Sequence, residues 1–219
     1  EKALEIEYDD AVAFELATIL YDQKEYQKAN LYFKQIDTIS PEFESYEYGY
    51  ALSLHAEHQT EEALRLTQQG LSKNPFDTRL LLLASQLSYE LHDEQKAEDY
   101  LLKAKDNAED LEEIALRLSN LYLEQERFDE VLKFEEQDID NVLTKWNIAR
   151  AYQALEQTTA ALERYRLLLS DLKENPEFLE QYIYLLREMG EFEEAKHQAE
   201  YYLHLVPDDV GMQELYDSL

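Results

Sequence analysis

One small residue recurs at a nearly constant interval along this chain. It closes short motifs such as YQKA and FEEA, and the intervals between successive copies are 34, 34, 34, 30 and 34 residues. The positions are Ala29, Ala63, Ala97, Val131, Ala161 and Ala195. A fixed period of this size is typical of a solenoid, in which each repeat buries its apolar face only against its neighbours. The period therefore constrains the fold more than any other feature of the sequence.

Each repeat is predicted to contain two helices. In the last repeat, one face of the first helical stretch carries apolar residues at three- and four-residue spacing: Leu179, Tyr182, Ile183 and Leu186. Gly190 follows where the chain must reverse, a conformation that glycine adopts at little cost. Pro207 ends the second stretch, because proline cannot continue a helix. The repeat is therefore predicted to be a helical hairpin.

A second set of small residues precedes the first by twelve positions. Small side chains that face each other across a hairpin let two antiparallel helices approach closely, so these residues are expected between the helices. They are Ala17, Ala51, Ser85, Ser119 and Ala149.

Composition excludes several other fold classes. The chain has only four Gly and four Pro, too few turn residues for a β-sandwich or an α/β fold of 219 residues. Cysteine is absent, so no disulfide framework or thiolate zinc site can form. No apolar run approaches the length of a membrane span. We predict an all-α protein and a cytoplasmic location, which the absence of cysteine permits.

The charge is strongly acidic. Lys and Arg number 20 against 49 Asp and Glu, which gives a net charge of −29. Such a surface repels phosphate backbones and anionic lipids, so nucleic acid and membrane are poor partners. Two interpretations stay open: the acidic residues serve only solubility, or they favour basic or neutral partners.

With these features in place, the chain resembles the tetratricopeptide repeat (TPR) family, whose unit is a 34-residue pair of antiparallel helices. Beside the small residues, large side chains match the family at Leu20, Tyr26, Leu54, Tyr122, Phe128, Tyr152, Leu186 and Phe192, and closing prolines match at Pro41, Pro75 and Pro207. The resemblance implies an all-α, right-handed superhelical solenoid of about six hairpins with a C-terminal capping helix.

The resemblance also divides the chain. Residues 1–9 resemble the end of a preceding second helix, which implies a further repeat upstream. Six repeats are expected at 10–43, 44–77, 78–111, 112–141, 142–175 and 176–207, and the capping helix at 208–219. Asp208 and Asp209 are its N-cap candidates.

Two repeats depart from the pattern. The fourth is four residues short, about one helical turn, and we expect a kink or a softer joint between it and the fifth. The third has Glu109 in place of a closing proline, so the segment AKDNAEDLEE is expected to be able to continue its helix.

In the TPR family the first helix of each repeat lines a concave, ligand-binding groove. The resemblance places these residues there: Phe14, Tyr21, Tyr48, Leu52, Leu82, Gln86, Tyr89, Leu116, Asn120, Trp146, Arg150, Tyr184 and Arg187, with Thr18, His55, Arg79, Leu123, Gln153 and Glu180 beside them. Aromatic residues of this kind suit peptide recognition. The alternative is that several of them pack against neighbouring helices. For Trp146 that alternative is a role in filling the joint left by the short fourth repeat; the groove is our preferred interpretation.

Other kinds of site find less support. One TPR subgroup holds acidic chaperone tails through a lysine, asparagine and arginine clamp; Asn120 and Asn147 match it, but Leu116 replaces the lysine, and we reject that function. His55 and His58 are too few for a zinc site. Neither a phosphate-binding loop nor a catalytic triad is visible in the sequence. We therefore predict no cofactor, no metal and no enzymatic activity.

The sequence predicts a non-enzymatic scaffold that binds a peptide segment of a partner protein in the concave groove. Because acidic residues outnumber arginines near the groove, the segment is expected to be apolar with basic flanks. The alternative is a structural module that mediates self-association or packs against another domain of the same longer chain.

Overall fold

The computed structural model describes residues 10–36, 46–137 and 139–219 of the chain. Within these residues all regular structure is helical, in thirteen α-helices and one short 3₁₀ helix. The all-α prediction is therefore confirmed. The expected helix end at residues 1–9 and the closing Pro41 lie outside the described residues. The chain divides into two compact units, Glu1–Glu109 and Asp110–Leu219, and each is described by itself.

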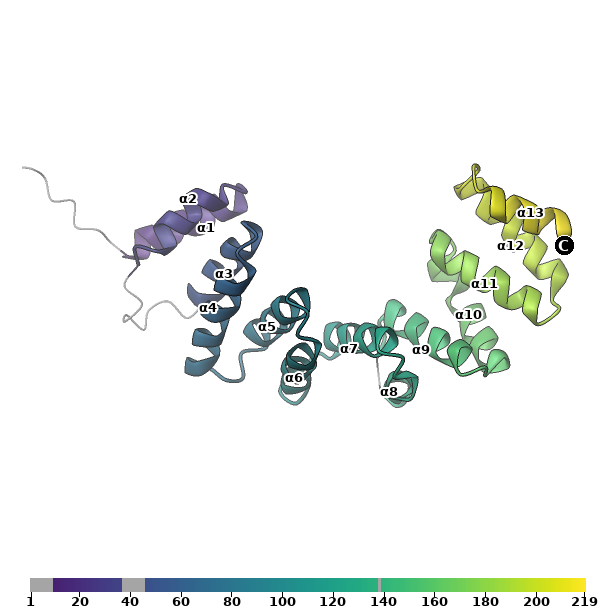
Figure 1. The fold of residues 1–219 in the computed structure, drawn as a ribbon, viewed down its shortest axis with the longest axis horizontal. Coiled ribbons are helices and arrows are strands. Elements are labelled where there is room, and N and C mark those ends of the chain that lie inside the picture. The colour runs from purple at the N-terminus through teal and green to yellow at the C-terminus, as the bar shows by residue number, and fades with distance from the viewer. Residues whose placement is uncertain (1–9, 37–45, 138) are drawn as a thin grey trace, which may run out of the picture. The chain divides into compact units, whose positions relative to one another are not determined.

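The first unit consists of helices that pack as consecutive pairs (Figure 1). Its core joins the first five helices and includes Phe33, Leu54 and Leu87, each at most 4% exposed. The helices are α1 (Asp10–Asp22), α2 (Tyr26–Phe33), α3 (Tyr46–Ala56), α4 (Thr60–Lys73), α5 (Thr78–Glu90) and α6 (Glu94–Lys105).

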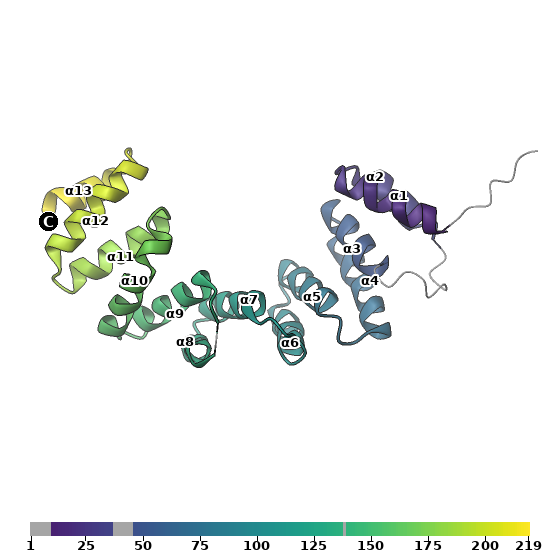
Figure 2. The same ribbon diagram turned by 180° about the vertical axis from the view of Figure 1, so that it is seen from behind.

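The second unit continues the pairing (Figure 2). Its core joins α9 to α13 around four aromatic residues, Trp146, Tyr165, Phe178 and Tyr182. The helices are α7 (Glu112–Glu124), α8 (Phe128–Leu132), the 3₁₀ helix η1 (Lys133–Glu136), α9 (Val142–Ala154), α10 (Thr158–Leu172), α11 (Pro176–Glu188), α12 (Phe192–Leu205) and α13 (Val210–Ser218).

The small residues predicted to lie between paired helices are buried. Each side chain of the two sets, from Ala17 and Ala29 in the first pair to Ala149 and Ala161 in the fifth, is at most 3% exposed. In the sixth pair Ile183 and Ala195 are both fully buried. Close approach at these positions is what lets each pair bury its apolar faces.

The turn inside each pair has one backbone conformation. The second of its three residues lies in the left-handed region, with φ between 56° and 78°. This residue is Lys24, His58, His92, Glu126, Glu156 or Gly190. The turn also closes with the same hydrogen bonds: Gly190 N donates to Arg187 O at 3.1 Å and Glu191 N to Leu186 O at 2.9 Å. This is the Schellman arrangement, and glycine occupies its left-handed position only in the sixth pair.

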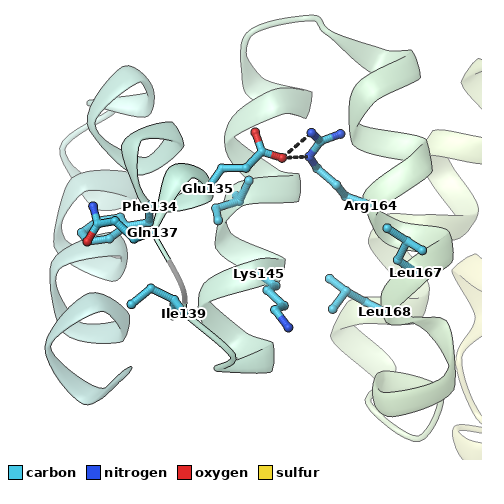
Figure 3. A pocket seen from close by; sticks show the side chains of 9 residues that line it. Phe134, Glu135, Gln137, Ile139, Lys145, Arg164, Leu167 and Leu168 are labelled. Atoms are coloured by element: carbon cyan, nitrogen blue, oxygen red, sulfur yellow. Dashed lines mark hydrogen bonds and ion pairs between the residues drawn. The ribbon is translucent and has the colours of Figure 1, made fainter. Parts of the chain in front are cut away.

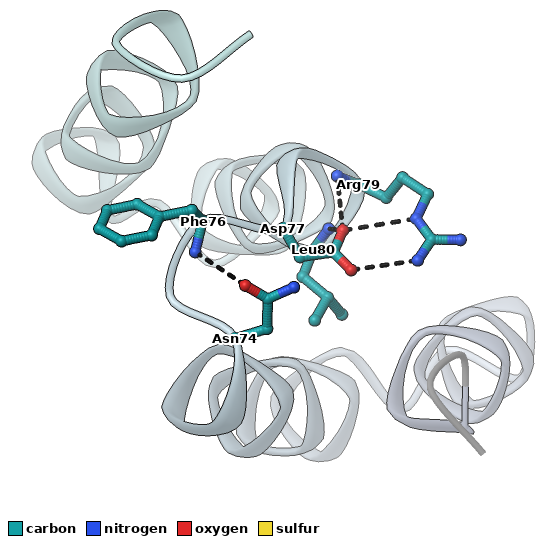
Figure 4. Close-up of polar contacts among 5 residues, drawn as sticks. All are labelled: Asn74, Phe76, Asp77, Arg79 and Leu80. Atoms are coloured by element: carbon teal, nitrogen blue, oxygen red, sulfur yellow. Dashed lines mark hydrogen bonds and ion pairs between the residues drawn. The ribbon is translucent and has the colours of Figure 1, made fainter. Parts of the chain in front are cut away.

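Side-chain caps start several of the helices. At α5, Asp77 Oδ1 accepts hydrogen bonds from the backbone N of Arg79 at 3.0 Å and of Leu80 at 3.3 Å (Figure 4). The Arg79 guanidinium also pairs with Asp77, at 3.1 Å. Burial raises the pKa of Asp77, but the hydrogen bonds from Arg79 and Leu80 outweigh burial and hold that pKa below its usual range. The cap therefore stays ionised at the positive end of the helix dipole.

The third repeat does not continue as a helix, contrary to expectation. α6 ends at Lys105, and the next helix begins at Glu112. The Asn107 amide nitrogen donates to the carbonyl of Lys103 at 2.7 Å, which satisfies an acceptor at the helix end. Asp110 then accepts from the backbone N of Glu112 at 2.9 Å. Side-chain hydrogen bonds thus accompany the end of one helix and the approach to the next, without a proline.

The fourth repeat is shortened in its second helix. α8 has five residues and passes into η1, after which Gln137 is extended. Asn141 then caps α9 by accepting from the backbone N of Thr144 at 3.0 Å. The joint is therefore built from 3₁₀ and irregular backbone where the other second helices keep regular turns.

α13 packs on α12 at the end of the chain. Asp209 caps α13 by accepting from the backbone N of Met212 at 2.9 Å, and the Tyr202 hydroxyl donates to the same carboxylate at 2.8 Å. Met212 and Leu215 are buried against the preceding pair. This arrangement is compatible with the predicted capping role.

The turn conformation predicts opposite effects for two substitutions. Gly190→Ala should lower the free energy of unfolding by about 1 kcal/mol, because alanine is strained in the left-handed region. An added Cβ would meet no atom within 4 Å, so the cost is conformational. His58→Gly should raise the free energy of unfolding by about 0.5 kcal/mol, since relief of that strain exceeds the entropy cost of glycine. Urea denaturation measures both, and a destabilising His58→Gly would contradict this account.

Hydrogen exchange tests the weak joint. Amides from Phe128 to Asn141 should exchange faster than those of the second and sixth pairs, because a five-residue helix followed by 3₁₀ backbone opens at low cost. Mass spectrometry of deuterated peptides would measure this. Equal protection in all three segments would remove the case for a soft joint.

Candidate functional site

A cavity of about 310 Å³ opens in the first unit among α1, α2 and α3. Five of its eight lining residues are positions that the TPR resemblance assigned to the groove. They are Phe14, Thr18, Tyr21, Tyr48 and Leu52, and the other three are Asp22, Phe33 and Gly49. The structure thus brings together residues of the first and second repeats that were predicted for the groove.

The cavity has an aromatic floor. Phe33 of α2 is 1% exposed, and its ring meets that of Phe14 edge-on, with centroids 6.0 Å apart. Tyr50 stacks on another part of Phe33 at 5.3 Å. Gly49 contributes space, because a Cβ there would already contact the Phe33 ring at 3.4 Å. The floor is therefore fixed by ring packing among the three helices.

Polar groups at the rim are few. Burial raises the pKa of Tyr21, whose hydroxyl is thus a neutral hydrogen-bonding group at neutral pH. Thr18 donates to the carbonyl of Phe14 at 2.9 Å. Asp22 brings a carboxylate to the lining. The guanidinium of Arg79 lies over the Tyr48 ring, 5.4 Å from its centroid, while it pairs with Asp77. The cavity can accept an apolar side chain, which would lie close to the guanidinium of Arg79.

The other predicted groove residues of the first unit lie on α5, apart from His55 on α3, and do not line this cavity. Leu82 and Gln86 are half-buried, and Tyr89 is 43% exposed. Gln86 donates to Glu90 at 3.1 Å. Glu90 also lies 2.7 Å from His55 Nε2, which ties α3 to α5. His55 therefore contacts a carboxylate of the next pair.

In the second unit, Asn120 belongs to a polar network between α7 and α9. The amide nitrogen of Asn147 donates to Asn120 Oδ1 at 2.6 Å and to the Ser119 hydroxyl at 2.9 Å. Arg150 donates to Asn147 Oδ1 at 3.4 Å. Asn147 is only 3% exposed. The asparagine pair that matches a chaperone clamp in sequence thus joins two helices here.

Trp146 is 6% exposed, so little of the indole is available to a ligand. Its Nε1 donates to Gln181 Oε1 at 3.2 Å, and its ring meets Phe178 edge-on at 5.8 Å. Arg150 lies over the indole at 5.6 Å. Trp146 therefore packs between α9 and α11, away from the gap in the fourth repeat that the packing alternative assigned to it. Its contact with a ligand stays a prediction.

Gln181 is a residue whose part the sequence did not reveal. Beside the Trp146 indole, its Oε1 accepts from the Tyr165 hydroxyl at 3.0 Å. Burial raises the pKa of Tyr165 to about 12, so this donor keeps its proton. The only signal in the sequence was that position 181 holds a glutamine where the clamp for acidic chaperone tails would need a basic residue.

The remaining predicted residues of the second unit differ in exposure. Leu116 and Arg150 are half-buried, whereas Asn120, Tyr184 and Arg187 are exposed. Tyr184 is 43% exposed on α11. These side chains are accessible, and their role in binding stays a prediction.

The part of the chain that the structure describes contains no group of three or more His, Asp or Glu that could hold a metal ion. Nor does any helix in it have the length and apolar character needed to cross a bilayer.

Comparisons with known proteins agree with the helical pairs. Residues 143–209 match a family described as YpiA-like, C-terminal tetratricopeptide repeats. No curated protein sequence matches the chain.

Solved structures share the fold over nearly the whole chain. The C-terminal part of a TPR repeat-containing protein from Cytophaga hutchinsonii has a TM-score of 0.78 at 16% identity, covering 96% of this chain and 88% of that one. Pseudomonas aeruginosa pilF has a TM-score of 0.69 at 16% identity, with 96% and 97% covered. YrrB, described as a TPR protein with an unusual peptide-binding site, has a TM-score of 0.61 at 13% identity, with 94% and 99% covered. At these identities the likeness shows the fold.

Burial of Trp146 changes what its truncation should do. Trp146→Ala should lower the free energy of unfolding by about 3–5 kcal/mol, as large-to-small changes in a core do. Tyr184→Ala is the matched control on the neighbouring helix and should cost about 1 kcal/mol or less. Thermal or urea unfolding compares the two variants, and equal losses would contradict the assignment.

Proposed function

We propose that this chain, which has the fold of tetratricopeptide-repeat proteins and matches such a family over residues 143–209, is a non-enzymatic scaffold that binds a peptide segment of a partner protein on its first helices. The observation that carries this proposal is the aromatic cavity of the first unit, where five predicted groove positions come together. The description of YrrB as a peptide-binding TPR protein supports it by analogy of fold.

The cavity suggests the chemistry of the segment. An apolar side chain fills the space above Phe33, and a flanking Lys or Arg lies near Asp22. The nearby cation Arg79 is paired with Asp77, so it does not neutralise the carboxylate of Asp22. A net charge of −29 also attracts a basic segment at long range. The proposed ligand is therefore apolar with basic flanks.

A second candidate function has an observation of its own. Val12, Leu16 and Ile19 of α1 are 51%, 39% and 44% exposed. Thirty-four residues later the equivalent positions of α3 are Tyr46, Tyr50 and Ser53.

Those equivalent positions pack on α2. The Tyr46 hydroxyl donates to the Phe33 carbonyl at 2.9 Å, Tyr50 stacks on the Phe33 ring, and Ser53 donates to the carbonyl of Tyr26. The exposed face of α1 thus has the register of a repeat-to-repeat interface. It favours self-association or packing against another part of a longer chain. Analytical ultracentrifugation of wild type and Leu16→Glu tests it: a dimer that Leu16→Glu dissolves supports self-association, and a monomer at all concentrations speaks against it.

Peptide selection tests the scaffold function. Random twelve-residue peptides displayed on phage should yield binders with aromatic or aliphatic residues flanked by Lys or Arg. Thr18→Arg places a cation and a bulky chain at the cavity while its exposed position spares the fold. It should weaken the selected peptides tenfold or more, and Leu31→Arg, an exposed substitution elsewhere in the unit, should not. Binding should also weaken as salt rises. Peptides that bind Thr18→Arg as tightly as wild type would overturn the proposal.

A further inference from the structure

A second cavity lies in the second unit, beside the shortened fourth repeat (Figure 3). Its volume is about 210 Å³. It is lined by Phe134, Glu135, Gln137 and Ile139 of the shortened fourth repeat, Lys145 and Ile148 of α9, and Arg164, Leu167 and Leu168 of α10. We call it the joint cavity. None of its lining residues was predicted as a site.

The repeat register explains why the joint cavity exists. Four residues after the small residue of each other second helix, the side chain is at most 2% exposed; these residues are Phe33, Thr67, Leu101, Tyr165 and Ala199. The equivalent residue of the fourth repeat is Glu135, which is exposed. The regular helix has also ended by Leu132. One apolar side chain and one helical turn are therefore missing at the same place, and Leu167 opposite is 78% exposed.

The polar groups that line the joint cavity differ in how readily they could bind a ligand. Glu135 pairs with Arg164 and accepts a hydrogen bond from the Tyr152 hydroxyl. Arg164 in addition donates to the Ala160 carbonyl at 3.0 Å. These two charges hold each other in place across the gap (Figure 3).

Lys145 is the charge that a ligand can use. Its Nζ lies 2.5 Å from Asp140 Oδ1, but the two side chains are 44% and 89% exposed. An ion pair this exposed adds little to stability, so a carboxylate from a ligand can replace Asp140. An ammonium group has three donors and can also bind both carboxylates.

We propose that the joint cavity is a second peptide-docking site, which takes one large apolar side chain of a partner and pairs Lys145 with a carboxylate next to it in the partner's sequence. An apolar cavity of about 150 Å³ binds benzene, so the joint cavity has room for a phenyl or leucyl group. Its lining holds two cations and one carboxylate in a chain of net charge −29. Asp140 balances the second cation, so a carboxylate of the segment binds by replacing this exposed partner, and the segment is acidic where the one proposed for the first unit is basic.

The test uses three capped six-residue peptides. The first has one phenylalanine with an aspartate two positions later, the second replaces the phenylalanine by serine, and the third replaces the aspartate by lysine. Each is titrated into the 15N-labelled full chain to several millimolar. The first should shift the amides of Ile139, Lys145 and Leu167 in a saturable way. The second should cause no saturable shift, and the third should bind at least threefold more weakly.

Two variants and one control locate the site. Leu167→Asp should weaken the first peptide tenfold or more, since it places a carboxylate over the opening at a position that is 78% exposed. Lys145→Gln should abolish the difference between the first and third peptides. Val210→Asp changes an exposed apolar residue that does not line the cavity and should leave binding unchanged. Circular dichroism checks that all three variants keep the wild-type melting curve.

Each result decides the matter. Absence of saturable shifts at those amides would overturn the proposal, as would undiminished binding to folded Leu167→Asp. Equal binding of the first and third peptides to wild type would remove the role of Lys145. Because Thr18→Arg alters only the first unit, its effect on basic peptides reports separately on the proposed scaffold function.

Discussion

The small residues buried inside each helix pair are the constraint on which the rest of the structure depends. A pair such as Ala51 and Ala63 is fully buried because neither side chain holds the helices apart. Large residues then lie to either side, where they meet the next pair; Phe33 contacts Tyr46 and Tyr50 in this way. Because every repeat packs its helices in the same way, this packing arrangement recurs at the period of the sequence.

Much of this fold could be predicted from the sequence, because its signals are local and repeated. The interval between alanines gave the pairs, and Asp209 was recognisable as an N-cap. The turns were only partly visible: Gly190 marks one left-handed residue, whereas Lys24 or His58 carries no such signal. The end of α6 was mispredicted, because the Asn107 side chain ends the helix where proline was missing.

The candidate site was harder to predict because it depends on partners distant in sequence. The TPR register assigned Phe14, Tyr21 and Tyr48 to the groove, and in the structure the three line one cavity. It also placed Trp146 on a first helix but could not show how deeply Phe178 and Gln181 enclose it. The joint cavity was missed for a related reason. The four missing residues predict a soft joint, but the sequence does not show which side chains of α10 lose their neighbours.

The short segment of α8 and η1 also affects how the second unit responds to tension. Regular helices such as α10 and α12 hold fifteen and fourteen residues, whereas α8 holds five. A pulling force along the chain would extend the segment with the fewest regular backbone hydrogen bonds first. Phe128 to Asn141 is thus a point at which the unit can lengthen while the core around Tyr165 and Tyr182 stays folded. We therefore expect the missing turn to set where the unit yields under tension, while the pairs that follow stay folded.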